Sequence, residues 1–277
     1  MSLLIPVAGV AERVSPADLD RLAPADVWVL GEAHGNPEHH ANQARAVAAL
    51  DPAALVFEML TPAQAARAAP PRPEDAATLG AILDWSAGGW PDFELYHPIF
   101  VAAPEAAVFG GALARTEVRR VFSEPLVEVF GAGASDFGLD RDLDPRDQVA
   151  REAGQAAAHC DALPEAMLPG MVAAQRLRDA ALARAVRAAH ADTGGPVVLI
   201  TGSAHARTDH GVPALLGMAA PDLSVRALGQ FEAPIGTEDP PFDLWIVTGS
   251  PDRGDPCAVF RSAPPVAQDG GPSLDPD

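Results

Sequence analysis

Residues 27–34 read VWVLGEAH, and residues 197–205 read VVLITGSAH. In both stretches a continuous apolar run is followed by Gly-x-x-His. Apolar runs without alternation are typical of strands that are covered on both faces of a sheet. The carboxyl ends of parallel strands meet at one edge, which is where α/β proteins bind ligands. We therefore expect His34 and His205 to converge on one site.

The rest of the chain continues this strand–helix alternation, which indicates an α/β protein with a mostly parallel sheet flanked by helices. Helices are expected over Pro37–Ala49 and Glu74–Trp85, and a capping box over residues 61–64 predicts a third helix. The strand candidates are Val27–Leu30, Ala54–Glu58, Ala107–Phe109, Val197–Ile200, Ser224–Leu228 and Asp243–Thr248.

The middle of the chain differs because it contains almost no β-type run. Helices are predicted there over Pro145–His159, Pro164–Leu177 and Arg178–His190. We expect a small helical subdomain over residues 116–190, inserted into an α/β domain formed by residues 1–115 and 191–262. Residues 263–277 are rich in Pro, Gly, Ser and Asp, which predicts a disordered tail.

The composition limits the possible partners. The formal net charge is −19, and such an acidic surface disfavours binding to nucleic acid or to anionic membranes. No stretch approaches the roughly 18 apolar residues of a membrane span. Cys160 and Cys257 lie in no CxxC motif, so ordinary thiols are expected. The chain as written predicts a cytoplasmic location, and a periplasmic or membrane-anchored one if a signal has been removed.

Acidic residues accompany the two histidine motifs. Glu32 and His34 are separated by one residue, and Glu58 ends the strand predicted at 54–58. A carboxylate in that position is costly to bury without a partner. Glu32, His34, Glu58 and His205 form a set that could act as general acids and bases. His34, Glu58 and His205 could instead hold a divalent metal ion.

Other polar residues have two interpretations each. One of His39 and His40 could face back to the sheet edge, but the polar face of a helix is the favoured place for the pair. The helical segment 175–179 contains Arg176 and Asp179, which are spaced for a local ion pair, and Arg178, which could reach a ligand carboxylate. His210 lies in a loop that is expected to close over the site. Tyr96, the only tyrosine, could ligate haem iron or be a half-buried helix aromatic.

Several motifs of enzyme classes are absent from the sequence. It contains no GxSxG elbow, no P-loop, no GxGxxG after the first strand and no HExxH. Serine hydrolases, P-loop NTPases, dinucleotide enzymes and zincins therefore lose their main support.

Residues 31–40, GEAHGNPEHH, resemble the opening motif of the ChaN-like haem-binding uptake family. Residues 96–100, the helical stretch 171–179, the loop 202–213 and residues 255–257 resemble the same family in the same order. The resemblance spans roughly residues 15 to 262. This family is similar to the Tiki/TraB proteins and the erythromycin esterases, with which it forms a wider superfamily.

The resemblance implies a parallel α/β sheet with a small helical domain, haem binding associated with iron uptake, and homodimers. It places His34 and His205 at the site, and family haem ligation by a tyrosine would fall on Tyr96. The alternative function is a hydrolase, with or without a divalent metal ion, in which His34 or Glu32 acts as general base.

Overall fold

The computed structural model describes residues 11–233, 235–236, 239–252, 254–255 and 257–258. The described residues form a seven-stranded sheet in the order β1-β7-β6-β2-β5-β3-β4, and every pairing is parallel. The strands are β1 (Glu12–Arg13), β2 (Val27–Glu32), β3 (Ala54–Phe57), β4 (Ala107–Gly110), β5 (Val197–Gly202), β6 (Val225–Phe231) and β7 (Leu244–Val247). The predicted α/β class with a parallel sheet is confirmed.

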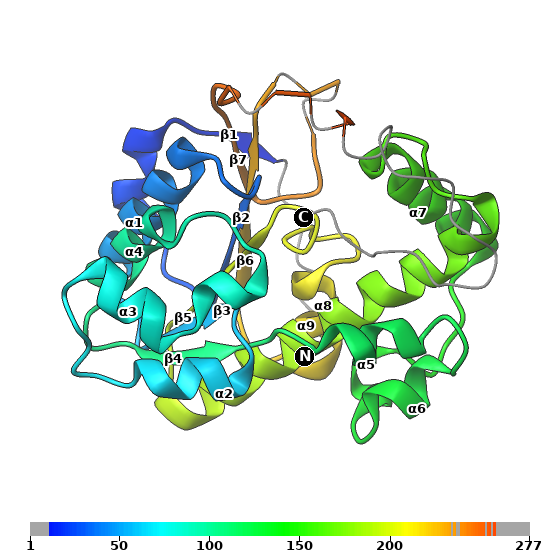
Figure 1. Ribbon diagram of the computed structural model, residues 1–277, viewed down its shortest axis with the longest axis horizontal. Helices are drawn as coiled ribbons and strands as arrows, with labels where there is room; N and C mark the ends of the chain where they lie inside the picture. Colours follow the sequence, from blue (N-terminus) through cyan, green and yellow to red (C-terminus); the bar gives the residue numbers. More distant parts are fainter. Residues whose placement is uncertain (1–10, 234, 237–238, 253, 256, 259–277) are drawn as a thin grey trace, which may run out of the picture. The chain divides into compact units, whose positions relative to one another are not determined.

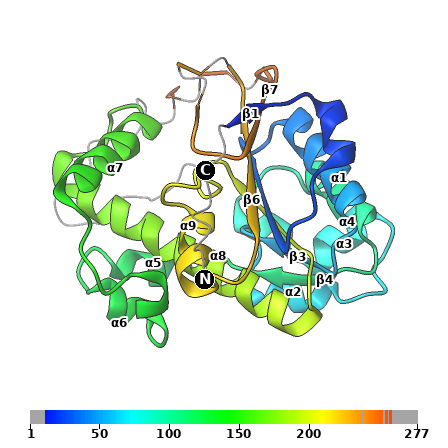
Figure 2. The same cartoon turned by 180° about the vertical axis from the view of Figure 1, so that it is seen from behind.

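Helices connect these strands. The α-helices are α1 (Pro37–Leu50), α2 (Pro62–Ala65), α3 (Ala76–Ile82), α4 (Phe93–Ala102), α5 (Arg115–Arg120), α6 (Leu126–Phe130), α7 (Pro145–Ala158), α8 (Leu168–Thr193) and α9 (Val212–Ala219). The 3-10 helices are η1 (Pro16–Arg21), η2 (Ala66–Ala68), η3 (Trp85–Gly88), η4 (Ala134–Phe137) and η5 (Glu165–Met167). Helices α1, α3 and α4 lie on one face of the sheet, and α9 lies on the other (Figures 1 and 2).

Coverage on both faces explains the uninterrupted apolar strands. Every residue of β2, β3 and β5 is buried. On the α1–α4 side, Phe57 of β3 stacks on Phe100 of α4 with ring centroids 4.5 Å apart. Burial of such apolar side chains is the main force that fixes the central strands and hence the edge at which they end.

The chain divides into two compact units. One unit consists of Met1–Ala112 and Ala181–Ser250 and contains the sheet, and the other consists of Leu113–Ala180 and Pro251–Asp277. The dividing point between residues 180 and 181 lies within α8, where we expected two helices meeting at residues 177 and 178. That expectation is wrong because no Gly or Pro interrupts the helix there. The tail expected at 263–277 lies outside the described residues.

Cys160 and Cys257 form a disulfide within the second unit, with Cα atoms 5.8 Å apart. The expectation of two ordinary thiols is therefore wrong. The residues are 97 positions apart, and two isolated cysteines give no sequence signal of such a pairing. No helix among the described residues is long and apolar enough to cross a membrane.

Removing this disulfide is expected to destabilise the protein strongly. Because the bond closes a loop of almost one hundred residues, replacing both cysteines with serine should lower the free energy of unfolding by about 4 kcal/mol. Urea unfolding with and without a thiol reductant measures this change. The wild type should respond to the reductant and the double variant should not; equal stability of both proteins without reductant would contradict the assignment.

Candidate functional site

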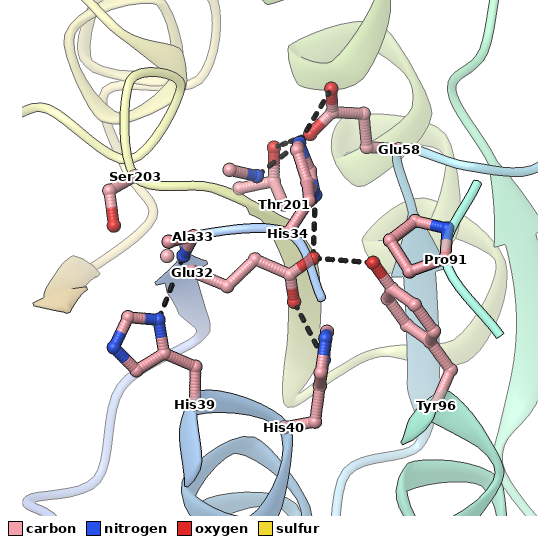
Figure 3. A network of polar contacts seen from close by, with 12 residues as sticks. Glu32, Ala33, His34, His39, His40, Glu58, Pro91, Tyr96, Thr201 and Ser203 are labelled. Carbon is pink, nitrogen blue, oxygen red and sulfur yellow. Dashed lines mark hydrogen bonds and ion pairs between the residues drawn. The ribbon is translucent and has the colours of Figure 1, made fainter. Parts of the chain in front are cut away.

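The two Gly-x-x-His motifs meet at the carboxyl edge of the sheet. β2 and β5 are neighbours in parallel register, with Gly31 opposite Thr201 and Glu32 opposite Gly202. Glu58 follows β3, which pairs with the other side of β5. This register brings the four residues expected at the site, Glu32, His34, Glu58 and His205, into one group of polar contacts, most of which Figure 3 shows.

The motif glycines make room for this convergence. A Cβ atom on Gly31 would lie 2.9 Å from the Leu228 carbonyl oxygen and 2.9 Å from the Ser203 Cα atom. A Cβ atom on Gly202 would lie 3.0 Å from His34 Nε2. Each glycine thus leaves space for a residue of the other motif, and a side chain at Gly31 would meet backbone on two sides.

The two glycines should respond differently to alanine. Gly31→Ala is expected to cost about 3 kcal/mol of stability because the backbone atoms around it cannot move aside easily. Gly202→Ala meets the movable His34 ring instead, so it should cost only about 1 kcal/mol while displacing that ring. Chemical denaturation of both variants checks the difference, and a larger loss for Gly202→Ala would refute this view of the packing.

Glu32 is the buried centre of the first half of the site. Its side chain is 0% exposed, and its Oε1 accepts hydrogen bonds from His34 Nδ1 at 2.7 Å and from the Tyr96 hydroxyl at 2.8 Å. Its Oε2 lies 3.1 Å from His40 Nδ1. Burial alone would raise the pKa of Glu32, but the contacts with His34 and His40 outweigh it and lower the pKa to about 2. Glu32 is therefore a carboxylate at neutral pH.

Glu58 is the centre of the second half. Its Oε2 accepts hydrogen bonds from Thr201 Oγ1 at 2.6 Å and from the Gly202 backbone N–H at 2.8 Å. Its Oε1 lies 3.3 Å from His205 Nε2 and 4.0 Å from His34 Nε2. Burial opposes ionisation, but the charges and hydrogen bonds of these neighbours, above all His205, hold the pKa of Glu58 well below its usual range.

His34 lies between these two carboxylates. Burial would lower its pKa, but the hydrogen bond to Glu32 and the nearby charges of Glu58 and Glu32 raise it to about 9. The ring therefore carries a proton at neutral pH. Its side chain is 20% exposed, compared with 7% for His205. Because Nδ1 is held by Glu32, the ring directs Nε2 towards Glu58 and Gly202.

A pocket of about 560 Å³ adjoins this group. The residues that line it come from the ends of β2, β5 and β6 and the loops that follow, and both histidine motifs contribute. The lining residues are Glu32, Ala33, His34, Gly202, Ser203, Ala204, His205, Gln230, Phe231, Glu232, Ala233 and Ile235. The pocket thus combines imidazole and carboxylate groups with alanine and larger apolar side chains.

The structure does not support a ligand role for Tyr96. This residue is 0% exposed, and its hydroxyl donates to the buried Glu32 carboxylate, as Figure 3 shows. A phenol oxygen in that position is directed into the core. Sequence alone could not reveal this, because Tyr96 lies on α4 and its partner Glu32 ends β2.

Two further cofactor contacts were expected, Arg178 and His210. Arg178 belongs to the second unit, on the first half of α8. His210 lies in the loop before α9 and forms an ion pair with Asp209, Nδ1 to Oδ1, at 3.0 Å. Neither lines the pocket formed by the described residues.

His39 and His40 are buried residues that we expected on a polar helix face, and this expectation is wrong. His39 Nδ1 accepts a hydrogen bond from the Ala33 backbone N–H at 2.8 Å, and its Nε2 contacts Thr248 Oγ1. The Asn36 side chain caps the N-terminus of α1, and both histidines lie close to that end of the helix. His39 and Gln43 are four residues apart and share the buried face with Val47. That spacing is the signal that could have revealed them.

The described residues contain no group of three or more His, Cys, Asp or Glu side chains arranged to hold a metal ion. The expected set of His34, Glu58 and His205 instead forms contacts of hydrogen-bond and ion-pair type, with the second oxygen of Glu58 already bound by Thr201 and Gly202. The described side chains thus form a paired histidine–carboxylate group.

The fold and the site together define an α/β protein with paired Gly-x-x-His loops at the carboxyl edge of a parallel sheet. The family model described as haem-binding uptake, Tiki superfamily, ChaN matches residues 19–216. This match covers more than half of the sequence, and the chain belongs to that family.

One solved structure shows the same fold, and two others are more distantly similar. A structure described as cofacial haem binding to ChaN of Campylobacter jejuni has a TM-score of 0.60 and 17% identity, covering 83% of this chain and 89% of that one. The type III effector HopBA1 follows with a TM-score of 0.45 and 12% identity, over 89% of this chain and 100% of that one. An erythromycin esterase mutant, EreC in its open conformation, has a TM-score of 0.36 and 14% identity, over 75% and 70%. No curated protein matches the chain.

Proposed function

We propose that this protein binds haem in the pocket beside the two Gly-x-x-His loops, with His34 as the residue that faces the iron. The observation that carries the proposal is the setting of the His34 ring. Its Nδ1 is held by the Glu32 carboxylate, and its Nε2 lies beside Gly202, which has no side chain to block it. Histidines that ligate metals usually donate their other ring N–H to a carboxylate or a carbonyl in this way.

The pocket supports the proposal by its size and lining. Cofactor pockets range from about 300 to 1,000 Å³, and this one measures about 560 Å³. Phe231, Ile235 and three alanines offer apolar contacts to a porphyrin face. Bound haem would supply an iron that an imidazole nitrogen could ligate. Membership in a family described as haem-binding is consistent with this ligand.

Each residue of the group has a defined part in this proposal. Glu32 fixes the ring of His34, and Glu58 keeps His205 and His34 near each other through its Oε1 atom. Because His34 is protonated at neutral pH, ligation by Nε2 has to release a proton. Tyr96 acts on Glu32 and not on the cofactor.

The test is a titration of the purified protein with ferric haem and, separately, with iron-free protoporphyrin. Haem should give a saturable Soret shift with one site per pocket, and the iron-free porphyrin should bind distinctly more weakly because it lacks the bond to His34. Equal affinities would exclude an iron ligand in the pocket, and no saturable shift with haem would refute haem binding itself.

A hydrolase is the second candidate function. The specific observation that favours it is the Glu32–His34 pair, which has the carboxylate–imidazole arrangement of hydrolytic triads. Glu32 itself is enclosed by its own donors, so His34 is the better general base. A base with a pKa of about 9 predicts ester hydrolysis that rises with pH up to about 9. A panel of ester substrates compared between wild type and His34→Ala tests this function.

We also infer that the chain matures in an oxidising compartment. The Cys160–Cys257 disulfide supports this inference, because disulfides persist mainly in secreted, periplasmic or surface proteins. Thiol trapping with an alkylating reagent compares protein made in the cytoplasm with protein directed to the periplasm. The disulfide should form only in the periplasmic sample, and full oxidation in the cytoplasmic sample would contradict the inference.

A further inference from the structure

The two carboxylate oxygens of Glu32 have different surroundings. Oε1 receives the hydrogen bonds from His34 and Tyr96, whereas Oε2 accepts no well-aligned hydrogen bond from the described residues. The group that faces Oε2 is His40 Nδ1, at 3.1 Å, and both side chains are buried. Figure 3 shows His40 reaching from α1 to the side of the carboxylate opposite Glu58.

The protein fixes the ring of His40 from two other directions. Gln43 Nε2 donates to the Leu30 carbonyl oxygen at 2.9 Å, so the Oε1 atom of Gln43 is an acceptor facing His40 Nδ1 at 3.2 Å. An acceptor on that side requires the proton of His40 to lie on Nδ1. The ring also packs on Tyr96, with centroids 4.1 Å apart.

The N–H of His40, held in this orientation, affects the position of the Glu32 carboxylate. The terminal torsion of glutamate is broad, and turning about it would move Oε1 away from its two donors. The N–H of His40 opposes that rotation by attracting Oε2. Because Oε1 sets the orientation of the His34 ring, a change at His40 should reach His34 although the two histidines are on opposite sides of Glu32.

We propose that His40 is a positioning residue, which holds the Oε2 atom of Glu32 so that Oε1 keeps His34 Nε2 directed towards the pocket. The value of this orientation for haem rests on the proposed function; the orientation itself belongs to the ligand-free protein. His40 would act through Glu32, without touching the ligand, like the outer-shell partners of metal-ligating histidines.

The test uses two substitutions that differ in one donor. His40→Asn keeps an amide N–H near the position of Nδ1, and His40→Leu fills the space without a donor. Val47→Ala, also buried on α1, is the control for general loss of helix packing. For each variant, NMR of the ligand-free protein follows the His34 Nδ1–H resonance, and a haem titration gives the affinity.

The expected result is a loss of the slowly exchanging His34 Nδ1–H resonance in His40→Leu, with about tenfold weaker haem binding. His40→Asn and Val47→Ala should keep both. An unchanged resonance in His40→Leu, or equal losses in His40→Leu and Val47→Ala, would overturn the proposal. If the wild type binds no haem, the proposed function fails, but the NMR comparison still decides the role of His40.

Discussion

Replacing His34 with alanine is expected to weaken the binding of ferric haem by on the order of 100-fold or more. Loss of an outer-shell partner of a metal ligand already costs about 10- to 100-fold, and His34 is the proposed ligand itself. The change removes the ion pair with Glu32 and so costs stability, but the side chain is partly exposed and its removal enlarges the pocket rather than opening a hole in the core. Titration monitored at the Soret band measures the affinity.

His210→Ala provides the matched control. His210 belongs to the same unit, is similarly exposed and pairs with a carboxylate, but it does not line the pocket. Its substitution should leave the haem affinity unchanged. If both variants bind haem as the wild type does, His34 is not the ligand; if both lose binding equally, the contact is not specific to the Gly-x-x-His loop.

Stability of the ligand-free protein should depend on pH in a way set by Glu32 and His34. The pKa of His34 rises from 6.5 to about 9 on folding, so its contribution is complete below pH 6.5 and is lost as the pH rises through 9. The pKa of Glu32 falls from 4.5 to about 2, so its contribution is complete above pH 4.5 and is lost towards pH 2. Stability should therefore be greatest between about pH 4.5 and 6.5.

The size of the loss of stability at alkaline pH identifies its source. A rise from 6.5 to about 9 corresponds to about 3 kcal/mol, which belongs to the coupled group of His34 and its two carboxylates, Glu32 and Glu58. Urea unfolding at pH 6 and pH 9.5 measures it. Glu32→Gln keeps the shape of the side chain without the charge, so it should be less stable at pH 6 and show a smaller decline, because Glu58 remains charged. A decline of the same size in Glu32→Gln would assign it to other groups.

Much of the fold could be predicted because its signals are local. Continuous apolar runs of β-branched and other large residues mark β2, β3 and β5, and the capping box of Thr61 and Gln64 marks the start of α2. The two-residue strand β1 carries no such signal and depends on pairing with β7. The disulfide was missed because it joins residues 97 positions apart. The continuity of α8 had a local signal, the lack of Gly or Pro near residues 177 and 178, which should have predicted one helix.

The site was predicted in part. The convergence of Glu32, His34, Glu58 and His205 follows from strand ends meeting at one edge, which a sequence pattern can indicate. The separate roles of these four residues could not be predicted from a sequence pattern. It depends on which donors surround each carboxylate, and those donors, Tyr96 and His40, reach Glu32 from two different helices.

Ligation of haem iron by His34 Nε2 can be observed in a crystal structure of the protein loaded with ferric haem. We expect porphyrin density in the pocket, an iron bonded to His34 Nε2, and Tyr96 still donating to Glu32. Haem bound elsewhere, or iron bonded to another residue with the His34–Glu32 pair undisturbed, would contradict it.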